Sequence, residues 1–446
     1  MPATAMDPRA LLADLYWAAV NAVAPGPALR LALEAEPGPP APRVHLLALG
    51  KAAGPMAAEA VAFLGRLGQS PAGGLLVVPE ATPSPDPSLA VLVGDHPIPD
   101  AGSFAASDRL AEAVQSVQAG DEVWVLLSGG ASSLIAAPLP PIGRSDLQGL
   151  FRLLLGSGLD ISAMNRVRKR FTRWAGGRLG LSLADAVVKN FTISDVINDD
   201  LASIGSGPCV ADPTTALELL EFLIQHEMWE PLSPALRTHL LAVREGQLAE
   251  TPKPGDPALE RISTKIIASN RLAVEAACRQ ARHHGASATI VNAALDGEAA
   301  VRGREIADQL RSNHASAPAM TQGSDMHNHS FYVWGGETTV TLPADAGLGG
   351  RNQELALAAA ERLRGVAGPV LLSAGTDGRD GPTDAAGAYA DGGTWNRISE
   401  AGRDPARDLA RHDSHAALEA AGDLFRTGMT GTNVMDLVLG FIPGKG

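Results

Sequence analysis

The feature that most constrains the fold is a short apolar run that leads directly into a glycine turn and then into helical periodicity. Residues 44–49 form such a run, the sequence GKAAG follows at 50–54, and residues 56–67 have helical spacing. Residues 123–127 form a second apolar run, which leads into the serine- and glycine-rich segment 128–133. Continuous apolar strands are typical of a parallel sheet that is covered by helices on both faces. The two units therefore predict an α/β protein with a parallel sheet.

The remaining segments predict two lobes. Residues 7–23 have helical periodicity, and residues 75–78 have the composition of a further buried strand. The stretch 251–257 is rich in proline and charge, which is typical of a linker. We therefore expect an N-terminal Rossmann-like α/β domain over 1–255 and a C-terminal α/β domain over 256–446.

The second lobe is expected to repeat the alternation of strands and helices. Apolar runs of three to five residues predict its strands, and 3.6-residue periodicity predicts its helices. The predicted elements are a strand at 266–268, a helix at 270–283, a strand at 288–291, paired strands at 331–333 and 338–342, a helix at 352–363 and a strand at 370–373.

The net charge of −13 excludes a large class of partners. Nucleic-acid binding needs a basic surface that releases counterions, so we expect no nucleic-acid partner. Six cations fall between residues 166 and 178, where they reverse the overall charge. This stretch is therefore a candidate for attracting anions, although a solvated helix face would have the same composition.

The cysteine content and the apolar runs indicate the compartment. Cys209 and Cys278 form neither a metal-binding spacing nor a disulfide framework, which fits a reducing compartment. No basic leader precedes an apolar core at the start, and no apolar run approaches the ~20 residues that cross a bilayer. We therefore expect a cytoplasmic protein without a membrane partner, either a monomer or a homodimer.

Lys51 lies between two glycines, directly after the first predicted strand. Free N–H groups at the start of a helix bind anions, and a lysine adds a point charge there. The spacing is not that of a Walker A loop. A tight turn with a surface lysine is the alternative interpretation.

Asp195 follows an apolar segment, and the ligands of open α/β sheets bind at the carboxyl ends of strands. A carboxylate in that position can act as a general base or as a magnesium ligand, and the sequence leaves both roles open.

Arg351 is the candidate anion-binding residue of the second lobe. It follows Gly347, Gly349 and Gly350 at the start of a predicted helix. A planar guanidinium there can bind a carboxylate or phosphate with two parallel hydrogen bonds. The loop at 373–387 carries three aspartates, but it lacks the closing glutamate of an EF-hand. We expect this loop to contact substrate or magnesium, with a solvated turn as the alternative.

Taken in order, these segments resemble the glycerate 2-kinase family, whose second lobe is called the MOFRL domain. Each segment is weak evidence alone, but the ordered set spans nearly the whole chain. The matching segments are 50–53, 95–97, 128–132, 165–169, 192–196, 205–208, 336–338, 350–354 and 375–378.

The resemblance implies a kinase that transfers the γ-phosphoryl group of ATP to the 2-hydroxyl of D-glycerate, with Mg²⁺, to give 2-phosphoglycerate. It implies an active site in the cleft between two lobes. Lys51 and Arg351 would be the catalytic cations, and Asp195 would be their acidic partner and the candidate magnesium ligand.

The same resemblance implies two further sets of contacts. The cofactor-binding residues would be Ser128, Gly129, Gly130, Ala131, Ser132, Ser133, Gly205, Ser206 and Gly207. The substrate-binding residues would be Lys51, Glu337, Arg351 and Asp377.

Two other functions are considered. An NAD(P)H-dependent hydroxypyruvate reductase would need a dinucleotide fingerprint, and no G-x-G-x-x-G occurs in the chain. It would also need a proton donor, for which His96 is the histidine just beyond a plausible strand end. The other alternative is an anion-binding protein without catalytic activity.

Overall fold

The computed structural model describes residues 7–316, 326, 328–343 and 345–444. The contacts divide the chain into two compact units. One unit is continuous, from Pro25 to Ile267. The other combines the residues up to Ala24 with those from Ala268 onward. Each unit is built around one six-stranded sheet. Among the described residues, no helix has both the length and the apolar character that crossing a membrane requires.

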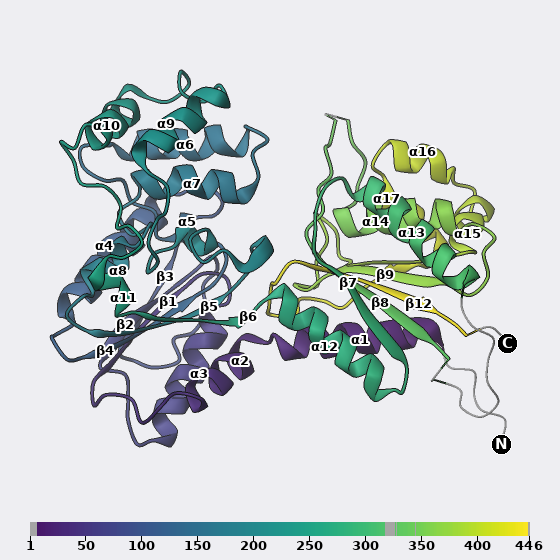
Figure 1. Ribbon diagram of the computed structural model, residues 1–446, viewed down its shortest axis with the longest axis horizontal. Helices are drawn as coiled ribbons and strands as arrows, with labels where there is room; N and C mark the ends of the chain where they lie inside the picture. The colour runs from purple at the N-terminus through teal and green to yellow at the C-terminus, as the bar shows by residue number, and fades with distance from the viewer. Residues whose placement is uncertain (1–6, 317–325, 327, 344, 445–446) are drawn as a thin grey trace. The chain divides into compact units, whose positions relative to one another are not determined.

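The sheet of the continuous unit has the strand order β3-β2-β1-β4-β5-β6, and β1 to β5 run parallel (Figure 1). Both β1 and β4 are buried along their whole length, as their apolar sequences predict. The strands are β1 (Val44–Leu49), β2 (Gly73–Val78), β3 (Leu89–Val93), β4 (Glu122–Leu127), β5 (Val187–Ile193) and β6 (Ser263–Ala268).

The helices of this unit form two groups. Helices α2, α3, α4, α5, α8 and α11 accompany the strands, whereas α6, α7, α9 and α10 share a separate apolar cluster (Figure 1). Their bounds are α2 (Pro25–Glu34), α3 (Ala53–Arg66), α4 (Ala101–Ser116), α5 (Ala131–Leu134), α6 (Arg144–Leu155), α7 (Ile161–Phe171), α8 (Arg178–Ser182), α9 (Ala216–Gln225), α10 (Pro234–Arg244) and α11 (Pro257–Glu260). Two 3₁₀ turns, Ile197–Asp199 and Ile204–Ser206, follow β5.

The sheet of the second unit has the order β11-β10-β9-β12-β8-β7. It is mixed, because β7 and β8 are parallel whereas the other neighbouring strands are antiparallel. The strands are β7 (Ser287–Leu295), β8 (Ser330–Gly336), β9 (Val370–Gly375), β10 (Gly387–Asp391), β11 (Leu424–Phe425) and β12 (Asp436–Ile442).

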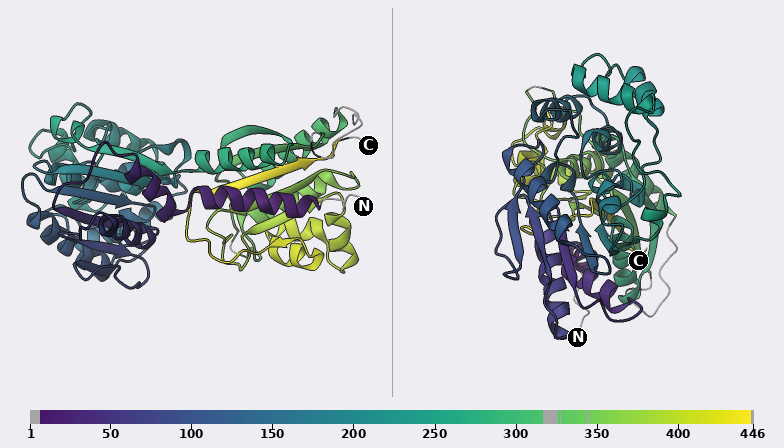
Figure 2. Two further views of the ribbon diagram at one scale, coloured as in Figure 1. Left: turned by 90° about the horizontal axis from the view of Figure 1, so that it is seen from below. Right: turned by 90° about the vertical axis from the view of Figure 1, so that its left-hand side faces the viewer.

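Helices cover both faces of this second sheet. Helices α1 and α12 lie on one face, and α13 and α14 lie on the other (Figure 1). The view from below shows α1 running beside β12 (Figure 2). The helices are α1 (Pro8–Ala22), α12 (Asn270–His283), α13 (Ala299–Ala315), α14 (Arg351–Leu363), α15 (Thr394–Glu400), α16 (Pro405–Ala410) and α17 (Ser414–Ala421).

The two units differ from the division predicted at residue 255. Helix α1 belongs to the second unit, because the hydroxyl of Tyr16 donates to the carbonyl of Gly375 at 2.8 Å and Arg9 pairs with Asp391 and Asp423. At the other end, the strand expected to begin the second lobe is β6, the edge strand of the first sheet. A division based on chain order does not show which sheet a terminal helix covers.

Two local expectations also differ from the structure. The predicted linker is an ordered part of the continuous unit, in which Thr251 is buried and its hydroxyl donates to Asp212 at 3.0 Å. Residues 338–342 do not pair with β8, and instead Thr339 forms an isolated bridge with Glu298. The strand that does lie beside β8 on that side is β12, which comes from the end of the chain.

Candidate active site

The turn that carries Lys51 lies against the turn that follows β4. Strands β1 and β4 are adjacent and parallel, so their carboxyl ends meet at the same edge of the sheet. The N–H of Lys51 donates to the carbonyl of Gly129 at 2.9 Å, and the N–H of Ala52 donates to Ser128 Oγ at 3.0 Å. A Cβ at Gly50, where φ is 120°, would lie 2.4 Å from Ser128 Oγ. Only glycine permits this close approach.

Asp195 lies against the same turn, because β5 is the next strand after β4. A Cβ built on Gly129 would lie 1.9 Å from Asp195 Oδ2, so the carboxylate occupies the space that a side chain at 129 would need. Burial raises the pKa of Asp195, and the charge of Lys51 offsets part of that rise. The Asp195 carboxylate is therefore a stronger proton acceptor than a solvated aspartate.

His96 completes this group. A Cβ at Gly130 would lie 3.4 Å from His96 Cδ2 and 3.4 Å from Lys51 Cγ, which places both side chains next to the Gly129–Gly130 turn. His96 is exposed as a residue, yet partial desolvation and the charges of Lys51 and Arg168 lower its pKa to about 4. His96 is therefore neutral at pH 7.

The two predicted cofactor turns are in direct contact. The hydroxyls of Ser132 and Ser206 lie 2.7 Å apart, and a Cβ at Gly205 would lie 2.9 Å from Leu127 Cδ1. Gly205 and Gly207 both have positive φ, which lets the second turn fold back onto the first. All nine predicted cofactor-binding residues therefore belong to one pair of contacting turns.

Four of the six cations lie on α7, and three of these, Arg168, Lys169 and Arg170, are buried instead of solvated. Asn165 Nδ2 donates to the carbonyl of Ser203 at 3.0 Å, and Lys169 Nζ donates to that of Ala202 at 2.8 Å. Helix α7 therefore supports the turn that holds Ser206. Arg178 has a structural role, because its guanidinium donates to the carbonyl of Lys169 at 2.8 Å.

In the second unit, Arg351 is the first residue of α14 and is already paired with two carboxylates. Its Nε and Nη2 donate to Asp436 at 2.5 Å and 2.9 Å, and its Nη1 lies 3.0 Å from Glu337 Oε1. Burial alone would lower the pKa of Arg351, but the charge and hydrogen bonds of Asp436 raise it above the ordinary value. Three of the five N–H donors of Arg351 are engaged in these contacts.

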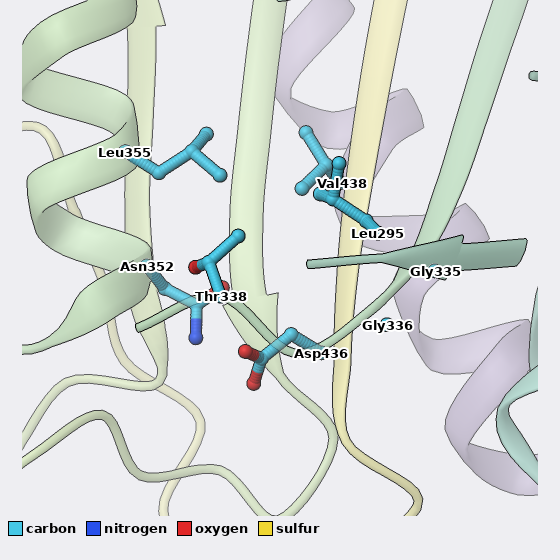
Figure 3. Close-up of a pocket in the computed structure, with 8 residues that line it drawn as sticks. All are labelled: Leu295, Gly335, Gly336, Thr338, Asn352, Leu355, Asp436 and Val438. Atoms are coloured by element: carbon cyan, nitrogen blue, oxygen red, sulfur yellow. The ribbon is translucent and has the colours of Figure 1, made fainter. Parts of the chain in front are cut away.

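Asp436 also lines a small pocket at this end of the sheet (Figure 3). The side chains of Thr338, Asn352 and Asp436 gather at the polar end of the pocket. The lining residues are Leu295, Gly335, Gly336, Thr338, Asn352, Leu355, Asp436 and Val438. Asp436 is not among the residues predicted from the sequence, although it lies directly before the apolar run 437–442.

Among the three aspartates of the 373–387 loop, Asp380 is the buried one and has a structural role. Asp380 is buried and accepts hydrogen bonds from the N–H groups of Asn352 and Gln353, at 3.1 Å and 2.9 Å. It therefore caps α14 beside Arg351. Asp377 is partly exposed after β9, and its Oδ1 accepts from the N–H of Arg379 at 3.0 Å.

The structure thus gathers the predicted residues into two groups. Lys51, Asp195 and both cofactor turns lie together at the carboxyl edge of the first sheet, and Arg351 lies with Glu337 in the second unit. A single cleft shared by the two groups stays a prediction.

Comparison with known proteins identifies the family. Residues 11–241 match a domain of unknown function, DUF4147, and residues 330–436 match the MOFRL family. A protein named D-glycerate 2-kinase from Thermotoga maritima is 36% identical over 401 residues, which cover 90% of this chain and 91% of that protein. The chain belongs to the glycerate 2-kinase family. The resemblance inferred from the sequence is therefore confirmed.

Other members of the glycerate 2-kinase family agree in sequence and in fold. Human glycerate kinase is 32% identical, and the alignment covers 96% of this chain and 92% of that protein. The crystal structure of a glycerate kinase from Thermotoga maritima has a TM-score of 0.85 and 34% identity, and the match covers 97% of this chain and 99% of that one. A protein from Agrobacterium vitis, 36% identical over 90% of this chain and 87% of its own length, has the provisional name hydroxypyruvate reductase.

A kinase that uses ATP normally also needs Mg²⁺, so the site must be able to hold this ion. Among the described residues, no three His, Cys, Asp or Glu side chains form a group that could hold a metal ion. Magnesium in phosphoryl-transfer sites needs only one or two carboxylates, because substrate phosphates and water supply the other ligands. Asp195, beside the two cofactor turns, fits such a site as the single protein carboxylate.

Proposed function

We propose that this protein transfers the γ-phosphoryl group of ATP to the 2-hydroxyl of D-glycerate, giving ADP and 2-phosphoglycerate. The observation that carries the proposal is the group formed by Lys51, Asp195 and the Gly129–Gly130 turn, in a chain of the glycerate 2-kinase family. Phosphoryl transfer needs positive charge on the migrating group and a positioned nucleophile, more than covalent help from the protein.

The two contacting turns are proposed to hold the phosphates of ATP. The segment Ser128–Ser133 offers main-chain N–H groups after a buried strand, and the Ser132–Ser206 pair adds two hydroxyls at the contact with Gly205–Gly207. Such concave arrangements of N–H and O–H donors bind phosphate oxygens. Lys51 is exposed beside them, where its ammonium can stabilise the charge that develops on the transferred group.

Asp195 is proposed to act on the acceptor hydroxyl. Its raised pKa makes it a better general base for the 2-hydroxyl proton, which it would accept as the oxygen attacks the phosphorus. Its other proposed role is that of magnesium ligand, in which case the ion would neutralise charge on the β- and γ-phosphates. In either role the side chain must be held in place, and its contact with Gly129 does this.

Arg351, Glu337 and Asp377 are proposed to bind the acceptor. Two N–H donors of Arg351 remain beyond its contacts with Asp436 and Glu337, and they can bind the carboxylate of glycerate. The two carboxylates hold the guanidinium in one orientation, which reduces the entropy lost on binding. Glu337 can also accept a hydrogen bond from a substrate hydroxyl.

The proposal also includes the cellular compartment, the partners and the assembly state of the enzyme. Both cysteines are free and buried, which fits a reducing compartment, and we place the protein in the cytoplasm. Its partners would be ATP and D-glycerate, and its assembly state would be monomer or homodimer.

Hydroxypyruvate reduction is the alternative, because relatives carry that provisional name. It would require a proton donor, and His96 is the candidate. With a pKa of about 4, His96 holds no proton to donate from an imidazolium at pH 7. The relatives named glycerate kinase, which match most of this chain, favour the kinase over the reductase.

A coupled assay of ADP release with ATP, Mg²⁺ and a panel of hydroxy acids tests the proposal. D-glycerate should be consumed with one ADP formed per molecule, and the product should be 2-phosphoglycerate. NADH oxidation with hydroxypyruvate, without ADP release from glycerate, would establish the alternative.

A further inference from the structure

Arg168 on α7 is a buried cation for which the described residues provide no carboxylate partner. The role proposed for it below rests on the proposed kinase function. Its two successors along the helix are also buried, but both are paired with acids. Lys169 Nζ lies 3.6 Å from Asp212 Oδ1, and Arg170 is paired with both Asp212 and Glu250. Arg168 is 5% exposed and forms no ion pair with any residue in the described part of the chain.

Neutral groups hold the guanidinium of Arg168 in place. It stacks on Phe151 at 4.5 Å from the ring centroid, and its Nη1 donates to Asn165 Oδ1 at 3.3 Å. Its Nη2 contacts the thioether of Met164, which is a weak acceptor. The Nε atom of Arg168 is buried, and no described residue forms a hydrogen bond with it. A buried charge normally requires compensation, so this side chain is positioned and yet incompletely satisfied.

Arg168 lies near the proposed phosphate-binding turns. Asn165, which accepts from Arg168, donates to the carbonyl of Ser203 directly before the Gly205–Gly207 turn. Arg168 is also close enough to His96 for its charge to lower the pKa of that side chain, as does the charge of Lys51. Two cations thus act on His96, beside the Gly129–Gly130 turn.

We propose that Arg168 binds an oxyanion of the reactants, either the carboxylate of the hydroxy acid or a phosphate of the nucleotide, next to Lys51. The missing counter-charge is then supplied by the substrate. The planar fork of an arginine can bind two oxygens of either group in parallel. Arg170 on the same helix differs, because its guanidinium is paired with Asp212 and Glu250 within the protein.

Steady-state kinetics of Arg168→Met and Arg168→Lys test the proposal. Arg168→Met should raise the KM of the bound reactant by about tenfold or more, because a charge-assisted contact is lost. A rise in the KM of D-glycerate alone assigns the carboxylate, and a rise in the KM of ATP alone assigns a phosphate. Arg168→Lys should recover part of the loss, since it keeps the charge without the fork.

Arg152→Met is the matched control, because Arg152 is an exposed arginine on the neighbouring helix α6. It removes the same charge and should leave both KM values within about twofold of the wild type. The same result for a folded Arg168→Met variant would overturn the proposal. If that variant does not fold, unchanged KM values in Arg168→Lys would overturn it.

Thermal unfolding with D-glycerate, ADP or inorganic phosphate as separate probes keeps this test independent of turnover. The probe that carries the oxyanion bound by Arg168 should raise the melting temperature of the wild type and of Arg152→Met. In Arg168→Met this rise in melting temperature should be largely lost. Equal rises in all three proteins would contradict the proposal. A wild type that responds to phosphate but releases no ADP with glycerate would instead refute the proposed activity.

Discussion

At the scale of single residues, close approaches between turns determine the site. Gly129 has no room for a side chain, because Asp195 Oδ2 occupies that space, and Gly50 has none because of Ser128. Lysines are few in this chain, and Lys51 lies beside the Gly129–Gly130 turn. The chemistry therefore depends on two glycines as much as on the charged groups that they allow to approach.

Replacing Lys51 by alanine should lower kcat/KM for phosphoryl transfer by roughly tenfold to a hundredfold, because a charge-assisted contact is worth about 1.5–3 kcal/mol. The circular dichroism spectrum should not change, since the side chain is exposed. Lys265→Ala, which removes a lysine paired with Glu36, is the control and should keep its activity. Activity of the Lys51 variant near that of the wild type would remove it from the site.

Replacing Gly129 by alanine should displace the Asp195 carboxylate, because the new Cβ would lie 1.9 Å from Asp195 Oδ2. We expect kcat to fall at least about tenfold, since a misplaced catalytic group costs this much or more. Gly65→Ala in α3 is the matched control, because a Cβ there meets nothing within 4 Å. That control should keep its activity and gain up to about 1 kcal/mol of stability. Full activity in the Gly129 variant would contradict the placement of Asp195.

At the scale of elements, the ends of strands and helices bring the polar groups together. Strands β1, β4 and β5 deliver their turns to one edge of a parallel sheet. Helix α14 begins at Arg351, where Asp380 caps its N–H groups and Asp436 of β12 pairs with the guanidinium. Side chains from the loop after β9 and from β12 thus hold the N-terminal end of α14 against the sheet by hydrogen bonds and an ion pair.

Asp436→Asn should weaken the ion pair between Arg351 and residue 436. We expect the free energy of unfolding to fall by about 1–3 kcal/mol, since this ion pair is partly buried and bidentate. Urea denaturation measures the change. Asp384→Asn, which weakens the exposed pair with Arg426, should cost at most about 1 kcal/mol. A smaller effect at Asp436 than at Asp384 would show that the Arg351 contact does not stabilise the fold.

At the scale of the whole molecule, the first helix completes the unit formed by the end of the chain. Leu12, Leu15 and Tyr16 of α1 are fully buried, and α1 packs on α12, β9 and β12. After α1, residues Pro25–Ile267 form the continuous unit, and the rest of the second unit comes from residues after Ile267. The second unit therefore cannot complete its core without residues from the start of the sequence.

Leu15→Ala should lower the free energy of unfolding by about 2–5 kcal/mol, because it removes a fully buried side chain. Leu31→Ala is the control, since Leu31 on α2 is 66% exposed and its loss should cost little. Chemical denaturation of both variants makes the comparison. Equal stabilities would mean that α1 is not part of the core.

The sequence by itself determined the α/β class, the family, most of the strands and the helices α1, α3, α12 and α14, because apolar periodicity and glycine turns are local signals. The helix and strand bounds at α1, β1, β4, α12 and α14 lie within about two residues of the expected ones. It also placed Lys51 and Asp195 at strand ends. Tertiary structure alone decided that α1 covers the second sheet, that β12 replaces residues 338–342 beside β8, and that Asp436 pairs with Arg351. These contacts join residues that are far apart in the chain. A local sequence pattern does not predict which distant segment will cover one face of a sheet or which distant side chain will pair with a charged group.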